Sequence, residues 1–108
     1  MLHIYPVVME LVREVGKLIP TLRAQSSELG DQCERALISV PLNLAEGTHS
    51  RGRNRHARYN TAAGSAREVL ACLETAEALG FMGAPSAELM ALFNQVIGTL
   101  VRLAAPRG

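Results

Sequence analysis

Apolar residues recur at helical spacing in four stretches of the 108-residue chain, and residues that favour turns separate the stretches. A repeat of three to four residues lines apolar side chains along one face of an α-helix. The chain shows no sustained alternation of apolar and polar residues of the kind that predicts a β-strand. The pattern therefore predicts an all-α protein with helices at about residues 4–25, 28–47, 54–79 and 86–104.

Prolines and glycines indicate where these helices bend or end. Pro20 and Pro41 each remove a backbone hydrogen bond, so we expect a kink or an early end at Pro20 and a bend at Pro41. Gly47 suits the left-handed cap that ends many helices, and Gly80 is expected to end the third helix. Ser86 is a candidate N-cap for the fourth helix.

Short links between long amphipathic helices favour antiparallel neighbours, so we expect an antiparallel up-down-up-down four-helix bundle. The length is that of one domain, which is expected to span residues 1–108. Hydrophobic residues make up 48% of the chain but aromatic residues only 4%, so aliphatic side chains must build the core. The last stretch has more apolar positions than one buried stripe needs, which indicates self-association.

Composition and motifs argue against several function classes. The net charge of +1 gives no global argument for a nucleic-acid partner. No apolar run approaches roughly 18 residues and no signal peptide is recognisable, so no membrane partner and a cytoplasmic location are expected. His49 and His56 lack the spacing of a metal-binding helix, and no cofactor, metal or catalytic constellation is expected. We therefore expect no enzyme.

The two cysteines form neither a CxxC metal site nor a disulfide framework. An antiparallel hairpin centred near residue 50 places Cys33 opposite about residue 67, so Cys72 would lie ~7 Å further along the axis. Added to a helix separation of roughly 8–10 Å, this offset argues against a disulfide. Both are expected to be small core or interface residues.

A series of residues between positions 32 and 80 follows the pattern Q-x-x-R-A-x-x-S-[IV]-x-x-N-[IL]-A-E-G, an arginine-bearing turn and G-S-x-x-E. The matching residues are Gln32, Arg35, Ala36, Ser39, Val40, Asn43, Leu44, Ala45, Glu46, Gly47, Arg51, Gly64, Ser65, Glu68, Leu79 and Gly80. This pattern resembles that of the four-helix bundle proteins encoded in bacterial 23S ribosomal RNA intervening sequences. Outside the block, the first and last helices match only as amphipathic segments. Pro20, and Asn60 in place of a bulky apolar residue, depart from the family pattern.

The resemblance implies a homopentamer whose bundles surround a central pore. It also implies a nucleic-acid role and a partner protein, because relatives include the accessory protein of diversity-generating retroelements, which binds nucleic acid and a reverse transcriptase. For most family members no biochemical activity is established.

Seven polar residues are expected to form a structural cluster between the second and third helices: Gln32, Arg35, Ser39, Asn43, Glu46, Ser65 and Glu68. The hairpin register predicts an Arg35–Glu68 ion pair, with Gln32 and Ser65 completing its hydrogen bonds, and places Ser39 opposite about residue 62. Glu46 is expected to meet Arg53 or Arg55, and Asn43 the Tyr59 hydroxyl. Asn43 and Glu46 either stabilise the turn or shape a site beside it.

The segment from His49 to Arg58 is the candidate functional site, because it carries four arginines and no acid. These candidate nucleic-acid-binding residues are Arg51, Arg53, Arg55 and Arg58. Arginines at a helix N-terminus present charge to phosphates, although only Tyr59 offers a ring for base stacking. For a single chain the pattern favours a solvated, disordered loop, whereas several copies on one face of an oligomer would bind a polyanion with avidity.

Three function classes follow from these observations. The first is an oligomeric accessory protein that binds RNA or DNA through the basic turn and docks a partner protein. The second is a structural or protein-interaction module without nucleic-acid binding, in which the arginines keep the turn soluble. An enzyme is the third class, kept only because a pore or a cleft between subunits could assemble residues that one chain keeps apart.

Overall fold

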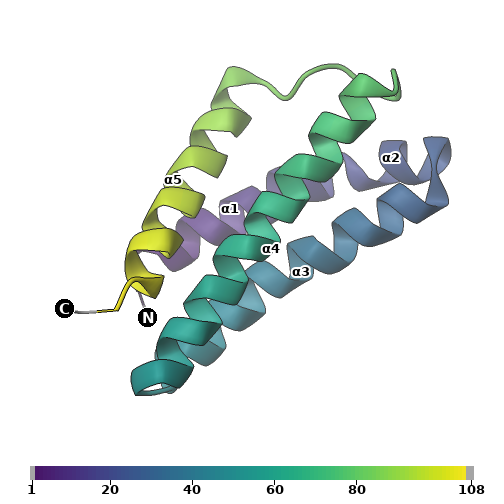
Figure 1. The fold of residues 1–108 in the computed structure, drawn as a ribbon. Helices are drawn as coiled ribbons and strands as arrows, with labels where there is room; N and C mark the ends of the chain where they lie inside the picture. Colours follow the sequence, from purple (N-terminus) through teal and green to yellow (C-terminus); the bar gives the residue numbers. More distant parts are fainter. Residues whose placement is uncertain (1, 107–108) are drawn as a thin grey trace.

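A computed structural model of the chain describes residues 2–106, and all regular secondary structure in that range is helical. The helices are α1 (Ile4–Gly16), α2 (Ile19–Gln25), α3 (Ser27–His49), α4 (Gly52–Ala78) and α5 (Ala87–Ala104). Helices α1 and α2 together occupy the place of one long helix in a four-helix bundle (Figure 1). The predicted all-α class and the four helical segments are confirmed.

The first predicted helix is broken, as the position of Pro20 suggested. Helix α1 ends at Gly16, and Pro20 lies in the first turn of α2, where its missing N–H costs nothing because that group has no partner within a helix. Pro41 behaves differently, since α3 continues through it for two more turns. The two prolines therefore have different effects, one starting a new helix and one tolerated inside a helix.

Gly80 and Ser86 end one helix and begin the next as expected. Gly80 has a φ of +76°, and the N–H groups of Gly80 and Phe81 bond back to the carbonyls of Glu77 and Ala76, which is the Schellman pattern. The Ser86 hydroxyl accepts the Leu89 N–H at 3.1 Å and so caps α5.

The prediction that Gly47 caps the second predicted helix in a left-handed conformation is wrong. Helix α3 continues to His49, and the glycines with positive φ among the described residues are Gly52 and Gly80. Gly47 is instead the point of closest approach between α3 and α4. A Cβ atom there would lie 2.5 Å from Cε1 of Tyr59, so the absence of a side chain makes room for the tyrosine ring.

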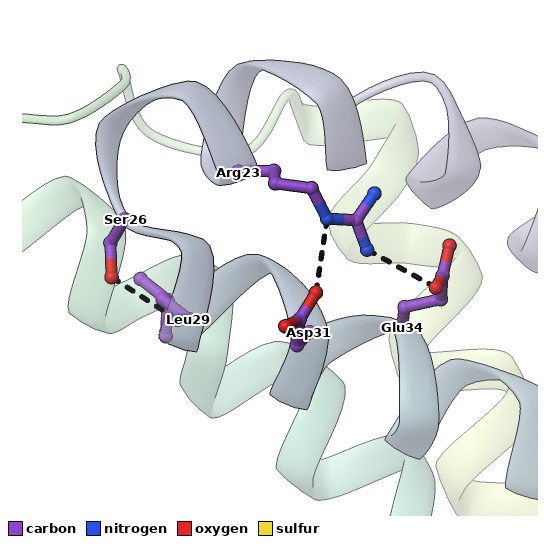
Figure 2. Close-up of polar contacts among 5 residues, drawn as sticks. All are labelled: Arg23, Ser26, Leu29, Asp31 and Glu34. Atoms are coloured by element: carbon purple, nitrogen blue, oxygen red, sulfur yellow. Dashed lines mark hydrogen bonds and ion pairs between the residues drawn. The ribbon is translucent and has the colours of Figure 1, made fainter.

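Helix α2 folds back onto the start of α3 (Figure 2). Arg23 of α2 donates from Nε to Asp31 at 3.0 Å and from Nη2 to Glu34 at 3.1 Å. These side chains are largely exposed, so the ion pairs add little stability. Helices α2 and α3 approach closely at Gly30, because a Cβ atom there would lie 2.8 Å from the Arg23 Cα.

Helices α3 and α4 run antiparallel, as do α4 and α5, around a shared core. Partners between α3 and α4 run in opposite directions along the chain, from Gln32 with Glu68 to Asn43 with Arg58. His56 near the start of α4 contacts Ala104 at the end of α5. The largest fully buried side chains are Val8, Leu11, Val15, Leu22, Cys33, Val40, Leu44, Val69, Leu73, Phe93, Val96 and Leu100. All five helices contribute, so the core joins the whole bundle.

Within the described residues, α5 is the one helix long and apolar enough by composition to cross a membrane, with a mean hydropathy of 1.2. Length and composition are weak criteria, because a helix that packs in the core of a soluble protein also meets them. Leu89, Phe93, Val96 and Leu100 of α5 are buried in the core of this bundle.

Candidate nucleic-acid interface

The link between α3 and α4 is Ser50 and Arg51 alone, so the expected disordered loop is replaced by helix. Gly52 adopts a left-handed φ of +56°, which lets the chain reverse within two residues. The Ser50 hydroxyl donates to the Glu46 carbonyl at 2.7 Å, and Arg55 Nε donates to the Ser50 carbonyl at 2.9 Å. The predicted basic turn is therefore mainly the first two turns of α4.

We call Arg51, Arg53, Arg55 and Arg58 the basic tip. All four residues are exposed. Arg58 contacts α3, where its Nη1 donates to Asn43 Oδ1 at 3.4 Å, and Arg55 lies on the side toward α5. Within residues 2–106 the ion pairs involve Lys17 and Arg23, and no Asp or Glu pairs with the basic tip. The tip thus carries positive charge that no carboxylate in the described part of the chain neutralises.

The N-terminus of α4 lies beside these arginines and has backbone N–H groups that no side chain caps. Its N-cap residue, Arg51, makes no side-chain cap hydrogen bond, and the first turn contains no acid. By contrast, Ser26 caps α3 and Ser86 caps α5, each with an acid in the first turn. The first amides of a helix carry a partial positive charge and bind anions, so they and the arginines attract the same kind of ligand.

The predicted Arg35–Glu68 ion pair is wrong. Arg35 is exposed and forms no ion pair within the described residues, whereas Gln32 Nε2 donates to Glu68 Oε2 at 3.4 Å. Ser39 shares a 2.7 Å hydrogen bond with Ser65 rather than facing residue 62. The Ser39–Ser65 pair therefore lies about one helical turn from the expected register, whereas Gln32 with Glu68 and Asn43 with Arg58 fit a turn centred near residue 50.

Asn43 and Glu46 also have partners other than those predicted. Asn43 Nδ2 donates to the hydroxyl and the carbonyl of Ser39, both at 2.9 Å, and Asn43 meets Arg58 instead of the Tyr59 hydroxyl. The exposed Glu46 side chain pairs with neither Arg53 nor Arg55, and only its carbonyl accepts, from Ser50. The polar cluster therefore stabilises the α3–α4 hairpin, and Asn43 connects it to the basic tip.

The expectation that the two cysteines form no disulfide and lie in the core is confirmed. Cys33 and Cys72 are free, buried thiols, and each influences the titration of the other. Burial, helped by the neighbouring Cys72, raises the pKa of the Cys33 thiol to about 12. Burial also raises the pKa of Cys72. Both thiols are therefore protonated and unreactive at neutral pH.

Beside the basic tip lies a cavity of about 470 Å³ between the start of α4 and the end of α5, which we call the α4–α5 cavity. Its lining residues are Leu2, Gly52, Arg55, His56, Tyr59, Arg102, Leu103 and Ala105. Arg102 is a site residue that the sequence pattern did not indicate. A larger cavity of about 690 Å³ lies between α1, the α4–α5 link and α5, and apolar side chains such as Leu18, Met82 and Leu92 line much of it. No group of three or more potential metal ligands occurs within residues 2–106.

The family model of the 23S rRNA-intervening sequence protein matches residues 1–102. The chain belongs to this family. Comparisons with curated proteins and with solved structures found no match. The family match extends well beyond the motif block of residues 32–80 and includes the first helices and most of α5.

In this 23S rRNA-intervening sequence protein, several motif residues act in the α3–α4 hairpin. Gly47 admits the Tyr59 ring, Ser39 bonds to Ser65, and Asn43 bonds to Ser39. Of the basic tip, Arg51 alone belongs to the motif that the sequence matched. The motif thus accounts for the shape of the hairpin, while the other three arginines add charge at its end.

Proposed function

We propose that this protein is a cytoplasmic, homo-oligomeric accessory protein that binds RNA or DNA through the basic tip and docks a partner protein, without catalysis of its own. The observation that carries the proposal is a set of four exposed arginines at an uncapped helix N-terminus, with no carboxylate partner among the described residues. Such a surface binds phosphates by charge, hydrogen bonding and release of counterions. Membership in the 23S rRNA-intervening sequence protein family is consistent with this role.

Exposed apolar side chains on two faces support the oligomer. Ile38 and Leu42 lie one turn apart on α3 and are 50% and 60% exposed, and Val101 on α5 is 40% exposed. Two different surfaces on one subunit allow head-to-tail contacts, which close into rings when the rotation fits. We propose the homopentamer that the family resemblance implies. Several basic tips on one face would then bind a single strand together.

A structural or protein-interaction module without nucleic-acid binding is the second candidate. The polar cluster favours it, because Ser39, Asn43 and Ser65 satisfy one another without any ligand. In that case the exposed apolar residues of α3 and α5 would be the functional surface, and the arginines would serve solubility. The two candidates differ in one property, which is the affinity of the tip for phosphates.

Fluorescence anisotropy with labelled single-stranded RNA and DNA of one sequence tests the proposal. The double variant Arg53→Ala/Arg55→Ala should bind about tenfold more weakly than the wild type. The matched control is Arg13→Ala/Arg67→Ala, which removes the same charge from exposed positions on α1 and the middle of α4. Absence of binding, or equal losses in both variants, would rule out a role for the basic tip and favour the second candidate.

A further inference from the structure

Helix α4 begins and α5 ends at the same end of the bundle (Figure 1). The α4–α5 cavity lies there as a cationic pocket that adjoins the basic tip. Arg55 and His56 of α4 and Arg102 of α5 all line it. None of the acidic residues within residues 2–106 lines the cavity. Its volume of about 470 Å³ falls within the range of cavities that hold small ligands.

Hydrogen bonds to neighbouring groups position all three of these side chains. Arg55 Nε donates to the Ser50 carbonyl at 2.9 Å, and Arg102 Nη2 donates to the Thr99 hydroxyl at 3.1 Å. His56 Nδ1 lies 3.2 Å from the Ala104 carbonyl. A carbonyl oxygen only accepts, so Nδ1 carries the proton of this bond. The remaining guanidinium N–H groups of both arginines are left to bind a ligand.

Tyr59 adds a hydroxyl donor to the lining of the cavity. The residue is 96% buried, and the Cδ1–Cε1 edge of its ring lies against Gly47. Its hydroxyl has no hydrogen-bond partner within residues 2–106, although a buried tyrosine hydroxyl normally finds one. No unpartnered polar side-chain atom in the described range is fully enclosed, so this hydroxyl is accessible to solvent, and Tyr59 lines the cavity.

We infer that the α4–α5 cavity binds the terminal phosphate of an RNA or DNA strand, an inference that rests on the proposed function. Two guanidinium groups, a tyrosine hydroxyl and the first amides of α4 are all donors, which is the chemistry that recognises phosphate oxygens. A phosphate within a strand has nucleotides on both sides and stays at the protein surface. A terminal phosphate has chain on one side and a second negative charge, so it suits a recessed cationic cavity.

Shared residues connect the cavity to the basic tip. Arg55 belongs to both, and Gly52, the first residue of α4, lines the cavity. A strand whose backbone runs across the tip can therefore place its end in the cavity without a change in the fold. The tip supplies affinity for any strand, and the cavity adds a preference for a phosphorylated end.

Oligonucleotides of one sequence that carry a 5′-phosphate, a 3′-phosphate or hydroxyls at both ends test this inference. The wild-type protein should bind one phosphorylated oligonucleotide about tenfold more tightly than the hydroxyl form, as expected for hydrogen bonds to a charged group. Arg102→Gln and Tyr59→Phe should each reduce that ratio toward one. Arg67→Gln, an exposed change in the middle of α4, should keep the ratio of the wild type. Inorganic phosphate, followed through the NMR signals of His56, identifies a site for the free ion.

The possible outcomes separate the two proposals. Equal affinity for all three oligonucleotides overturns the inference and leaves the proposed function in place. A phosphate preference that survives both Arg102→Gln and Tyr59→Phe also overturns it. If inorganic phosphate shifts the His56 signals while the strand ends make no difference, the cavity binds the free ion and not a strand end. If no oligonucleotide binds at all, the proposed function fails and the inference fails with it.

Discussion

Gly47 and Tyr59 determine how closely α3 and α4 approach beside the basic tip. A Cβ atom at position 47 would lie 2.5 Å from Cε1 and 2.7 Å from Cδ1 of the Tyr59 ring, so Gly47→Ala must displace that ring. We expect a net loss of about 1–3 kcal/mol in the free energy of unfolding, measured by urea denaturation. The loss should outweigh the gain in helix propensity that alanine normally brings.

Gly64→Ala is the matched control, because a Cβ atom at this mid-helix position of α4 meets nothing within 4 Å. This variant should gain about 0.5–1 kcal/mol, since alanine is the better helix former. A Gly47→Ala variant as stable as Gly64→Ala would show that Tyr59 does not require the glycine.

The Cys33 thiol makes the free energy of unfolding depend on pH in the alkaline range. Burial raises its pKa from 9.0 to about 12, so the unfolded chain loses this proton first as the pH rises. The contribution to stability is complete below about pH 9 and decreases between pH 9 and 12. The urea concentration at the midpoint of unfolding should therefore decrease when the pH is raised from 7 to 10. This decrease should be smaller for Cys33→Ala. Equal decreases in both proteins would contradict this role of the thiol.

At the residue scale, the sequence predicted the members of the polar cluster better than their partners. Gln32, Ser39, Asn43, Ser65 and Glu68 do form contacts between or within α3 and α4. Partners depend on the register of the hairpin, which is set by the glycine that makes the turn. The prediction ended the helix at Gly47 and centred the turn near residue 50, whereas α3 continues to His49 and the left-handed residue is Gly52, so several predicted partners were wrong.

At the scale of elements, the N-terminus of α5 offers a direct test of capping. Ser86 accepts the Leu89 N–H at 3.1 Å, and Glu88 lies in the first turn. Ser86→Ala should lower the free energy of unfolding by about 1 kcal/mol, because that amide loses its partner. Thermal unfolding measures the loss, and Ser86→Asp, which keeps an acceptor, should recover most of it. If aspartate is as destabilising as alanine, the cap does not account for the effect.

Element boundaries that depend on local chemistry were predictable, and those that depend on a distant partner were not. The break near Pro20, the end at Gly80 and the start at Ser86 follow from the residues themselves. The role of Gly47 depends on Tyr59, which no local pattern reveals. The place of Arg102 depends in the same way on residues far away in the sequence, because it lines the cavity together with Arg55 and His56 of α4. The short link between the last two helices was the one signal that the end of α5 lies beside the start of α4.

At the scale of the whole molecule, exposed apolar side chains predict self-association. Ile38 and Leu42 form an apolar patch on α3 that a monomer leaves in water. Sedimentation should give several times the mass of one chain for the wild type, and the mass of a monomer for Ile38→Glu/Leu42→Glu. Thr61→Glu, at an exposed polar position of α4, should leave the oligomer unchanged. A monomeric wild-type protein would argue against the proposed ring.

The dependence of strand affinity on salt tests the central claim most directly. Each phosphate contact with a single strand contributes about −0.7 to the slope of log affinity against log salt, so the four arginines of one basic tip give about −2.8. The proposed function predicts a slope at least this steep for wild-type protein, and steeper if several tips of an oligomer bind one strand. Affinity that does not change with salt would contradict binding through the basic tip.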